Sequence, residues 1–192
     1  MSDAMNEETV DINSELLSPF EILAEYERRS LAHSAGLPEQ IDAPGLWRGI
    51  GFRVGLRHMV SSLAEVNEIL AYPQVAHVPG TRPWLLGVAS VRGNLVPLVD
   101  LKQFLSGEPS SPTDSSRVLV VRQTGGMVGL LVDEVVGQRN FSPEQRVEKE
   151  KLEGDDPYAR YVLEDYALGE VQWGQFSMAA LVRAPEFVQA AA

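Results

Sequence analysis

Side chains that could perform chemistry are few in this sequence, and their spacing fits no metal or catalytic site. The three histidines, His33, His58 and His77, stand far apart, and there is no cysteine to join them as a ligand. A lone histidine is far more often a surface or core-edge residue than a ligand. The histidines therefore predict no metal centre.

The acidic pairs and the glycine run indicate no chemistry either. Asp133-Glu134 follows an apolar run, and because neighbours on a strand face opposite ways, we expect these carboxylates not to share a face. Asp155-Asp156 lacks the alternating oxygen ligands of a calcium loop. Thr124-Gly125-Gly126 precedes a strand and lacks the lysine of a phosphate-binding loop, so it predicts a hairpin turn. We expect no enzymatic activity and no cofactor.

The overall composition narrows the class of partner. Of the 192 residues, 44% are hydrophobic and 22% are charged, which is the balance of a folded protein. Acidic residues number 27 against 16 basic ones, giving a net charge of −11. Because nucleic acids and anionic membranes are bound mainly through Lys and Arg, we expect neither partner. The absence of cysteine excludes disulfides.

No segment predicts a membrane span or export. No window approaches the ~18 consecutive apolar residues of a membrane helix. The stretch Met1 to Val10 is acidic and polar, whereas a secretory signal begins with basic residues and continues with an apolar run. We therefore expect a cytoplasmic protein without direct membrane insertion.

Residues 1–45 form an acidic extension that differs from the rest of the chain. Up to Glu27 it contains eight acidic residues and no basic one. Ser18-Pro19-Phe20-Glu21 is a capping box with proline at the first helical position, which predicts a helix over about 19–33. We expect Gly36 and Pro38 to end this helix, and Pro44-Gly45 to act as a linker. Residues 46–185 form the predicted main domain.

The predicted helix has a modest apolar face, for which two interpretations stay open. The face comprises Phe20, Leu23, Ala24 and Leu31. It could pack on the main domain of the same chain, or lie in the groove of a partner. We favour the first interpretation, because an apolar face on a short helix needs covering.

From Trp47 onward, short apolar stretches separated by turn residues predict a mainly β fold. Eight to ten strands are expected, which favours barrels or a sandwich. The expected strands include Ile50–Leu56, Val66–Leu70, Leu95–Val99, the halves of an apolar hairpin at Val118–Val121 and Val128–Val136, and two late strands at Tyr158–Tyr166 and Val171–Phe176. We expect one helical turn at Trp84–Val88. Short helices should follow the capping residues Asp100 and Ser177, the second ending at Pro185.

The block Pro79 to Leu101 contains the residues best suited to bind a partner. Gly87 lies between apolar residues, so we expect another backbone to pass close to it or the chain to bend there. Arg92-Gly93-Asn94 separates two apolar strands and predicts an exposed turn. An arginine there offers five rigid donors to a carboxylate or carbonyl, although it could also serve only to solubilise the turn.

This block resembles the CheW coupling-protein family, whose signature is Gly-Val-x-Asn-x-Arg-Gly-x-hydrophobic-x-Pro-hydrophobic-x-Asp-Leu. The matching residues are Gly87, Val88, Val91, Arg92, Gly93, Pro97, Asp100 and Leu101. Further similar elements occur in the family's order at 51–55, 66–69, 79–80, 117–121 and 129–135. The resemblance spans about Trp47 to Val182. Ser90 stands where the family usually has asparagine, so side-chain bracing of the turn differs here.

The resemblance implies two intertwined, SH3-like five-stranded β-barrels around a shared core. It also implies a non-catalytic adaptor between the cytoplasmic tip of methyl-accepting chemoreceptors and the regulatory domain of a CheA-type histidine kinase. By the same resemblance, the partner-binding residues are Arg92, Glu68, Val66, Gly87 and Gly93.

The N-terminal helix and the ending Trp173-x-x-Phe176-Ser177 are more similar to the PilI-type branch of this family. That branch implies a chemotaxis-like system controlling type IV pili and twitching motility. An alternative function for a β-rich domain of this size is a small-molecule-sensing β-barrel regulatory domain.

Overall fold

A computed structural model describes residues 18–32, 46–148 and 156–190 of the chain. The chain divides into two compact units, residues 1–42 and 43–192, which are described separately below. Several predicted features lie outside the described residues, namely His33, the helix stop at Gly36 and Pro38, the linker Pro44-Gly45, and Asp155.

Helix α1 (Pro19–Ala32) begins at the predicted capping box. The backbone N–H of Ser18 donates to Glu21 Oε2 at 2.7 Å, and the N–H of Glu21 donates to Ser18 Oγ at 3.3 Å. The bond from Ser18 lowers the pKa of Glu21 below its ordinary value. Phe20 is 79% exposed and Leu23 67% exposed on this helix. The side chain of Leu31 lies outside the described part.

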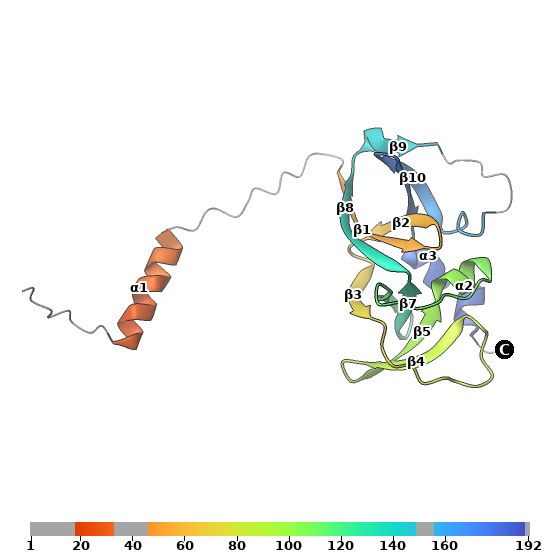
Figure 1. The fold of residues 1–192 in the computed structure, drawn as a ribbon, viewed down its shortest axis with the longest axis horizontal. Helices are drawn as coiled ribbons and strands as arrows, with labels where there is room; N and C mark the ends of the chain where they lie inside the picture. The colour runs from red at the N-terminus through yellow and green to blue at the C-terminus, as the bar shows by residue number, and fades with distance from the viewer. Residues whose placement is uncertain (1–17, 33–45, 149–155, 191–192) are drawn as a thin grey trace, which may run out of the picture. The chain divides into compact units, whose positions relative to one another are not determined.

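The second unit is built from two sheets (Figure 1). The six-stranded sheet, called sheet A, contains in spatial order β8 (Glu134–Phe141), β1 (Trp47–Val54), β2 (Arg57–Ser62), β11 (Val171–Phe176), β10 (Val162–Leu168) and β9 (Arg146–Val147). The five-stranded sheet, called sheet B, contains β3 (Val66–Ala71), β6 (Arg117–Gln123), β7 (Gly126–Val132), β5 (Asn94–Asp100) and β4 (Leu85–Val91). The β2–β11 and β5–β7 pairs are parallel, and the other pairs are antiparallel. Sheet A thus combines strands from both ends of the domain.

The described part of the domain has three hydrophobic cores. The largest contains side chains from both sheets, including Phe52, Leu119 and Phe176. A second core covers the other face of sheet B, and a third, rich in aromatic rings, covers the other face of sheet A. In the third core, Trp47 and Tyr166 stack with ring centroids 6.0 Å apart. The expected mainly β fold with a shared core is confirmed.

The strand arrangement refines the expectation of two intertwined five-stranded barrels. Within residues 46–148 and 156–190, the hydrogen-bonded ladders form sheets of six and five strands and leave both open. The apolar run predicted as one strand at 128–136 is divided between β7 and β8, because the chain bends at Asp133. The strand predicted from Tyr158 begins only at Val162.

The helix caps of the domain follow local sequence signals. Asp100 precedes α2 (Leu101–Ser106) and accepts the N–H of Gln103 at 3.1 Å, as predicted. It also accepts the N–H and the hydroxyl of Ser110, each at 2.7 Å, which ties down the following loop. Ser177 caps α3 (Met178–Arg183). Pro185 follows α3 but also starts α4 (Pro185–Val188), because proline fits the first position of a helix.

Two further sequence predictions are wrong. Residues Trp84–Val88 do not form a helical turn, because Leu85–Val91 pairs with β5 as strand β4. Asp133 and Glu134 do converge on one group, since Arg53 contacts Asp133 Oδ2 at 3.4 Å and Glu134 Oε1 at 2.9 Å. Strand alternation does not apply to them, because Asp133 lies in the bend between β7 and β8. In the described part of the chain, no helix is long and apolar enough to cross a membrane.

Burial of tyrosines predicts a loss of stability at alkaline pH. Burial raises the pKa of Tyr158, Tyr161 and Tyr166 above the ordinary value, because the neutral phenol is favoured in the folded protein. The contribution of these buried phenols to the stability of the folded protein is fully present below about pH 10, the pKa of an unfolded tyrosine. It is lost as pH rises through the higher pKa of the folded protein. The thermal unfolding midpoint should therefore fall above about pH 10. Tyr158→Phe should reduce this dependence, whereas a flat profile would contradict the explanation.

Candidate functional site

The predicted exposed turn at Arg92 and Gly93 joins β4 to β5, and its backbone is unusual. Arg92 has φ 50° and Gly93 has φ 82°. Two positive φ values are the requirement of a type I′ hairpin turn, which usually takes Asn, Asp or Gly. Among the described residues, Arg92 is the only non-glycine residue with positive φ. An arginine here costs about 1 kcal/mol of backbone strain, so its side chain has a reason to be retained.

The Arg92 side chain forms an ion pair with Glu68 on strand β3. Nη2 lies 2.7 Å and Nε 2.9 Å from Glu68 Oε1. Strands β3 and β4 occupy opposite ends of sheet B, so the sheet must curl to bring these residues together. The Arg92 side chain is 77% exposed and that of Glu68 is 24% exposed. The guanidinium thus keeps donors that a partner can reach, while Glu68 Oε1 accepts both bonds within the chain.

Exposed apolar side chains lie on strands β3 and β5, close in sequence to Glu68 and Arg92. Leu95 is 77% exposed and lies opposite Ser90 in the β4–β5 ladder. Ile69, next to Glu68 on β3, is 38% exposed. We call the group of Glu68, Ile69, Arg92 and Leu95, from β3, the β4–β5 turn and β5, the hairpin surface. A surface with apolar area and an oriented charge is suited to bind another protein.

The other three predicted site residues lie around the hairpin surface in different ways. Gly93 is exposed, with open space where a side chain would project. Val66 is half-buried and packs against the core shared by the sheets. Gly87 is buried and lies against the backbone of Ala76, which is the first of the two alternatives that the sequence left open. The structure therefore brings Arg92, Gly93 and Glu68 together, and gives Val66 and Gly87 supporting positions.

The sequence did not indicate that Arg92 and Glu68 pair with each other, although it named both. Their separation of 24 positions is bridged only because sheet B curls. The sequence offered one signal for this pairing: Arg92 and Glu68 carry opposite charges and both occupy motif positions. In the described part of the chain, no group of three or more His, Asp or Glu side chains could hold a metal ion. The hairpin surface can position a partner, but its side chains do not form a catalytic set.

Comparison with known proteins decides the family. A family model described as the CheW-like domain matches residues 48–191. The chain belongs to the CheW-like family. The match covers nearly all of the domain described above, including both sheets and the hairpin surface.

Individual relatives agree with this assignment. Protein PilI of Pseudomonas aeruginosa is 43% identical over 128 residues, which is 67% of this chain and 72% of PilI. Chemotaxis protein CheW of Bacillus subtilis is 31% identical over 85 residues, or 44% of this chain and 54% of that protein. The crystal structure of the scaffolding protein TtCheW from Thermoanaerobacter tengcongensis matches with a TM-score of 0.61 at 17% identity, covering 74% of this chain and 91% of that chain. At that identity, the structural likeness shows the fold.

Gly87 should be intolerant of any side chain, for a structural reason. It has φ 140°, and a Cβ atom would lie 2.2 Å from the carbonyl oxygen of Ala76. Gly87→Ala should therefore lower the free energy of unfolding by about 3 kcal/mol, from backbone strain and displacement of the 75–76 segment. Urea denaturation measures this change.

Gly80→Ala is the matched control for this substitution. Gly80 also has positive φ, 72°, but nothing lies within 4 Å of the position of its Cβ. Its substitution should cost only about 1 kcal/mol. Equal losses at both positions would show that the approach of Ala76 is not the cause.

Proposed function

We propose that this CheW-like protein is a non-catalytic adaptor that couples methyl-accepting chemoreceptors to a CheA-type histidine kinase. Membership of the CheW-like family over residues 48–191 is the observation that carries the proposal. The relatives include proteins named for chemotaxis, and a solved relative is described as a scaffolding protein. The proposed partners are the cytoplasmic tip of the receptor and the regulatory domain of the kinase, with the adaptor in the cytoplasm.

We further propose that the system controls type IV pili and twitching motility. The 43% identity to PilI of Pseudomonas aeruginosa supports this branch, and it exceeds the 31% identity to CheW of Bacillus subtilis. In this system the adaptor would have no reaction of its own. Its output would be the assembly of receptor and kinase.

The hairpin surface is the proposed partner contact. Leu95 and Ile69 would contribute apolar area, and the Arg92 guanidinium would fix the register of the partner. Because Glu68 holds the guanidinium from within the chain, the charge is oriented before binding and less side-chain entropy is lost. Gly93 maintains the turn that presents Arg92. Val66 and Gly87 support partner binding indirectly, because they maintain the fold.

Arg92→Asn tests this contact while keeping the turn. Asparagine tolerates positive φ, so the hairpin should be retained, and the lost exposed ion pair should cost less than about 1 kcal/mol of stability. Loss of the oriented charge should weaken binding of a receptor-tip fragment or a kinase regulatory fragment about tenfold. Binding of each fragment to the full-length chain is measured separately, alongside the thermal unfolding midpoint.

Arg146→Gln is the matched control. Arg146 is also exposed, at 61% of its side chain, and pairs with Glu164 at 2.8 Å, but it lies on sheet A. This variant should bind both fragments as the wild type does. If Arg92→Asn also binds both fragments normally, the hairpin surface is not a partner contact.

The double variant Arg92→Glu with Glu68→Arg separates two roles of the ion pair. It re-forms an ion pair between strand β3 and the β4–β5 turn with the charges exchanged, so the curling of sheet B should be retained. If the guanidinium contacts the partner, this variant should still bind about tenfold more weakly than the wild type. Wild-type binding of both fragments would show that the pair acts only within the fold.

A further inference from the structure

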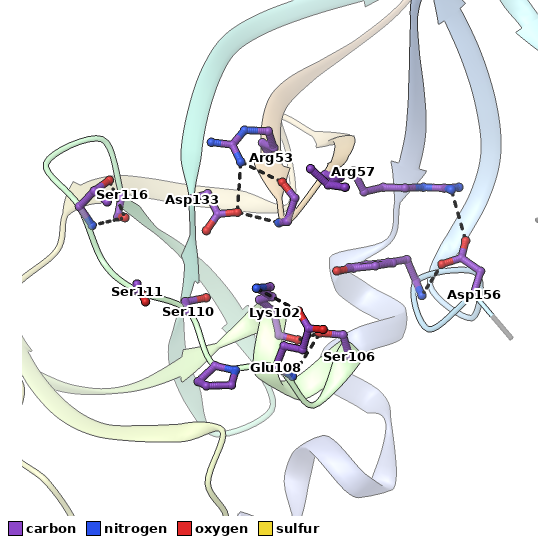
Figure 2. A pocket seen from close by; sticks show the side chains of 15 residues that line it. Arg53, Arg57, Lys102, Ser106, Glu108, Ser110, Ser111, Ser116, Asp133 and Asp156 are labelled. Carbon is purple, nitrogen blue, oxygen red and sulfur yellow. Dashed lines mark hydrogen bonds and ion pairs between the residues drawn. The ribbon is translucent and has the colours of Figure 1, made fainter. Parts of the chain in front are cut away.

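A cleft lined mainly by polar residues, none of which belongs to the hairpin surface, opens between the two sheets (Figure 2). Its walls are the turn between β1 and β2, helix α2 with the loop that follows it, and the segment around Asp156 and Tyr158. Its volume is about 820 Å³. Sites for small molecules usually have volumes of ~300–1,000 Å³, so the cleft is large enough to hold one.

Three cationic side chains from different elements line this cleft (Figure 2). Arg53 comes from β1, Arg57 from the start of β2, and Lys102 from α2. Their side chains are only 33%, 20% and 24% exposed, respectively. Partly buried cations need acceptors, because burial without partners destabilises the charged form.

The carboxylates on the cleft wall already have donors. Asp133 Oδ2 accepts the N–H of Gly55 at 2.6 Å and also faces Arg53. Asp156 Oδ1 accepts the N–H of Tyr158 at 3.0 Å, while its other oxygen faces Arg57. These carboxylates are therefore held by the protein itself and have little need of a bound cation.

Arg53 is also well satisfied. It donates to Glu134 Oε1 at 2.9 Å and to the carbonyl oxygen of Gly55 at 2.8 Å. Together with Asp133, it locks the turn that forms the upper wall of the cleft in Figure 2. Its role is to build the cleft rather than to bind a ligand.

Arg57 and Lys102 have spare donors. The nearest carboxylate oxygens to Arg57, on Asp156 and Asp165, lie at 3.4 and 3.5 Å, whereas a charge-assisted bond is usually ~2.7–2.9 Å. Lys102 contacts only the carboxylate of Glu108, at 3.2 Å, among the described carboxylates, and Glu108 is 74% exposed. A guanidinium has five donors and an ammonium three, so donors outnumber acceptors here. The exposed hydroxyl of Ser111 adds another donor to the cleft.

We propose that this cleft binds a small oxyanion, a phosphate- or carboxylate-bearing metabolite, between Arg57 and Lys102. The ligand supplies the acceptors that these two cations lack, and Glu108 moves into solvent when the ligand takes its place. Arg57 lies on strand β2 of sheet A, whereas Lys102 lies on α2, which directly follows strand β5 of sheet B. The ligand therefore bridges the two halves of the domain and stabilises their arrangement. The site is independent of the hairpin surface and of the proposed coupling function.

Isothermal titration calorimetry of the full-length protein with pyrophosphate and with citrate tests the proposal, at constant ionic strength. The expected result is a dissociation constant below about 1 mM for at least one of the anions. Binding of pyrophosphate alone assigns a phosphate ligand, and binding of citrate alone assigns a carboxylate ligand. If neither pyrophosphate nor citrate binds at a concentration of about ten times this 1 mM limit, the proposal is wrong.

Three variants assign the binding to the cleft. Arg57→Gln and Lys102→Gln should each weaken binding at least about tenfold, because each removes a charged donor. Lys102→Gln is the safer variant, since its ion-pair partner is exposed, whereas Arg57 faces the buried Asp165. Arg160→Gln, an exposed arginine paired with Glu186 outside the cleft, should bind as the wild type does. Wild-type affinity in a folded Lys102→Gln protein, or equal losses in all three variants, would overturn the site.

Discussion

The side chains of β6 alternate between two hydrophobic cores, and this two-sided burial constrains the rest of the domain. Leu119 and Val121 enter the core shared by the sheets, while Val118 and Val120 enter the core on the other face of sheet B. Since most of both faces of the sheet must be apolar, charged groups are confined to turns, strand ends and sheet edges. The hairpin surface and the cleft lined by Arg57 and Lys102 both occur at such places. Their positions thus follow from how the sheets are buried.

The ion pair between Arg92 and Glu68 is a consequence of the curling that encloses a core. Sheet B has β3 and β4 at its two ends, and the pair joins β3 to the turn that follows β4. An exposed pair of this kind contributes little to stability, typically below ~1 kcal/mol. It therefore does not by itself account for the strain of an arginine at positive φ. The proposed role in orienting a partner would account for both features.

Motif residues in this family do not all have the same physical role. Gly87 and Arg92 both belong to the matched signature, yet Gly87 is buried against Ala76 and Arg92 projects into solvent. A substitution at Gly87 would change the fold before it changed any interface. Loss of partner binding therefore identifies a contact residue only when the stability of the variant is measured as well.

The sequence alone determined the features that depend on a few neighbouring residues. These are the caps at Ser18, Asp100 and Ser177, the turn at Arg92, and the close approach at Gly87. Such features depend on side-chain to backbone bonds and on permitted φ values, which are local. The hairpin surface could be predicted to this extent: its turn and its charged residues, but not their pairing.

The tertiary structure decided what depends on distant strands. Pairing with β5 made a strand of residues 85–91, where the local pattern suggested a helical turn. Arg53 pairs with both Asp133 and Glu134, which lie about 80 positions further along the chain. The curling of sheet B places Arg92 beside Glu68. The cleft with Arg57 and Lys102 exists only once both sheets are packed. No local signal encodes these contacts, because each depends on how a curved sheet places residues that are far apart in the chain.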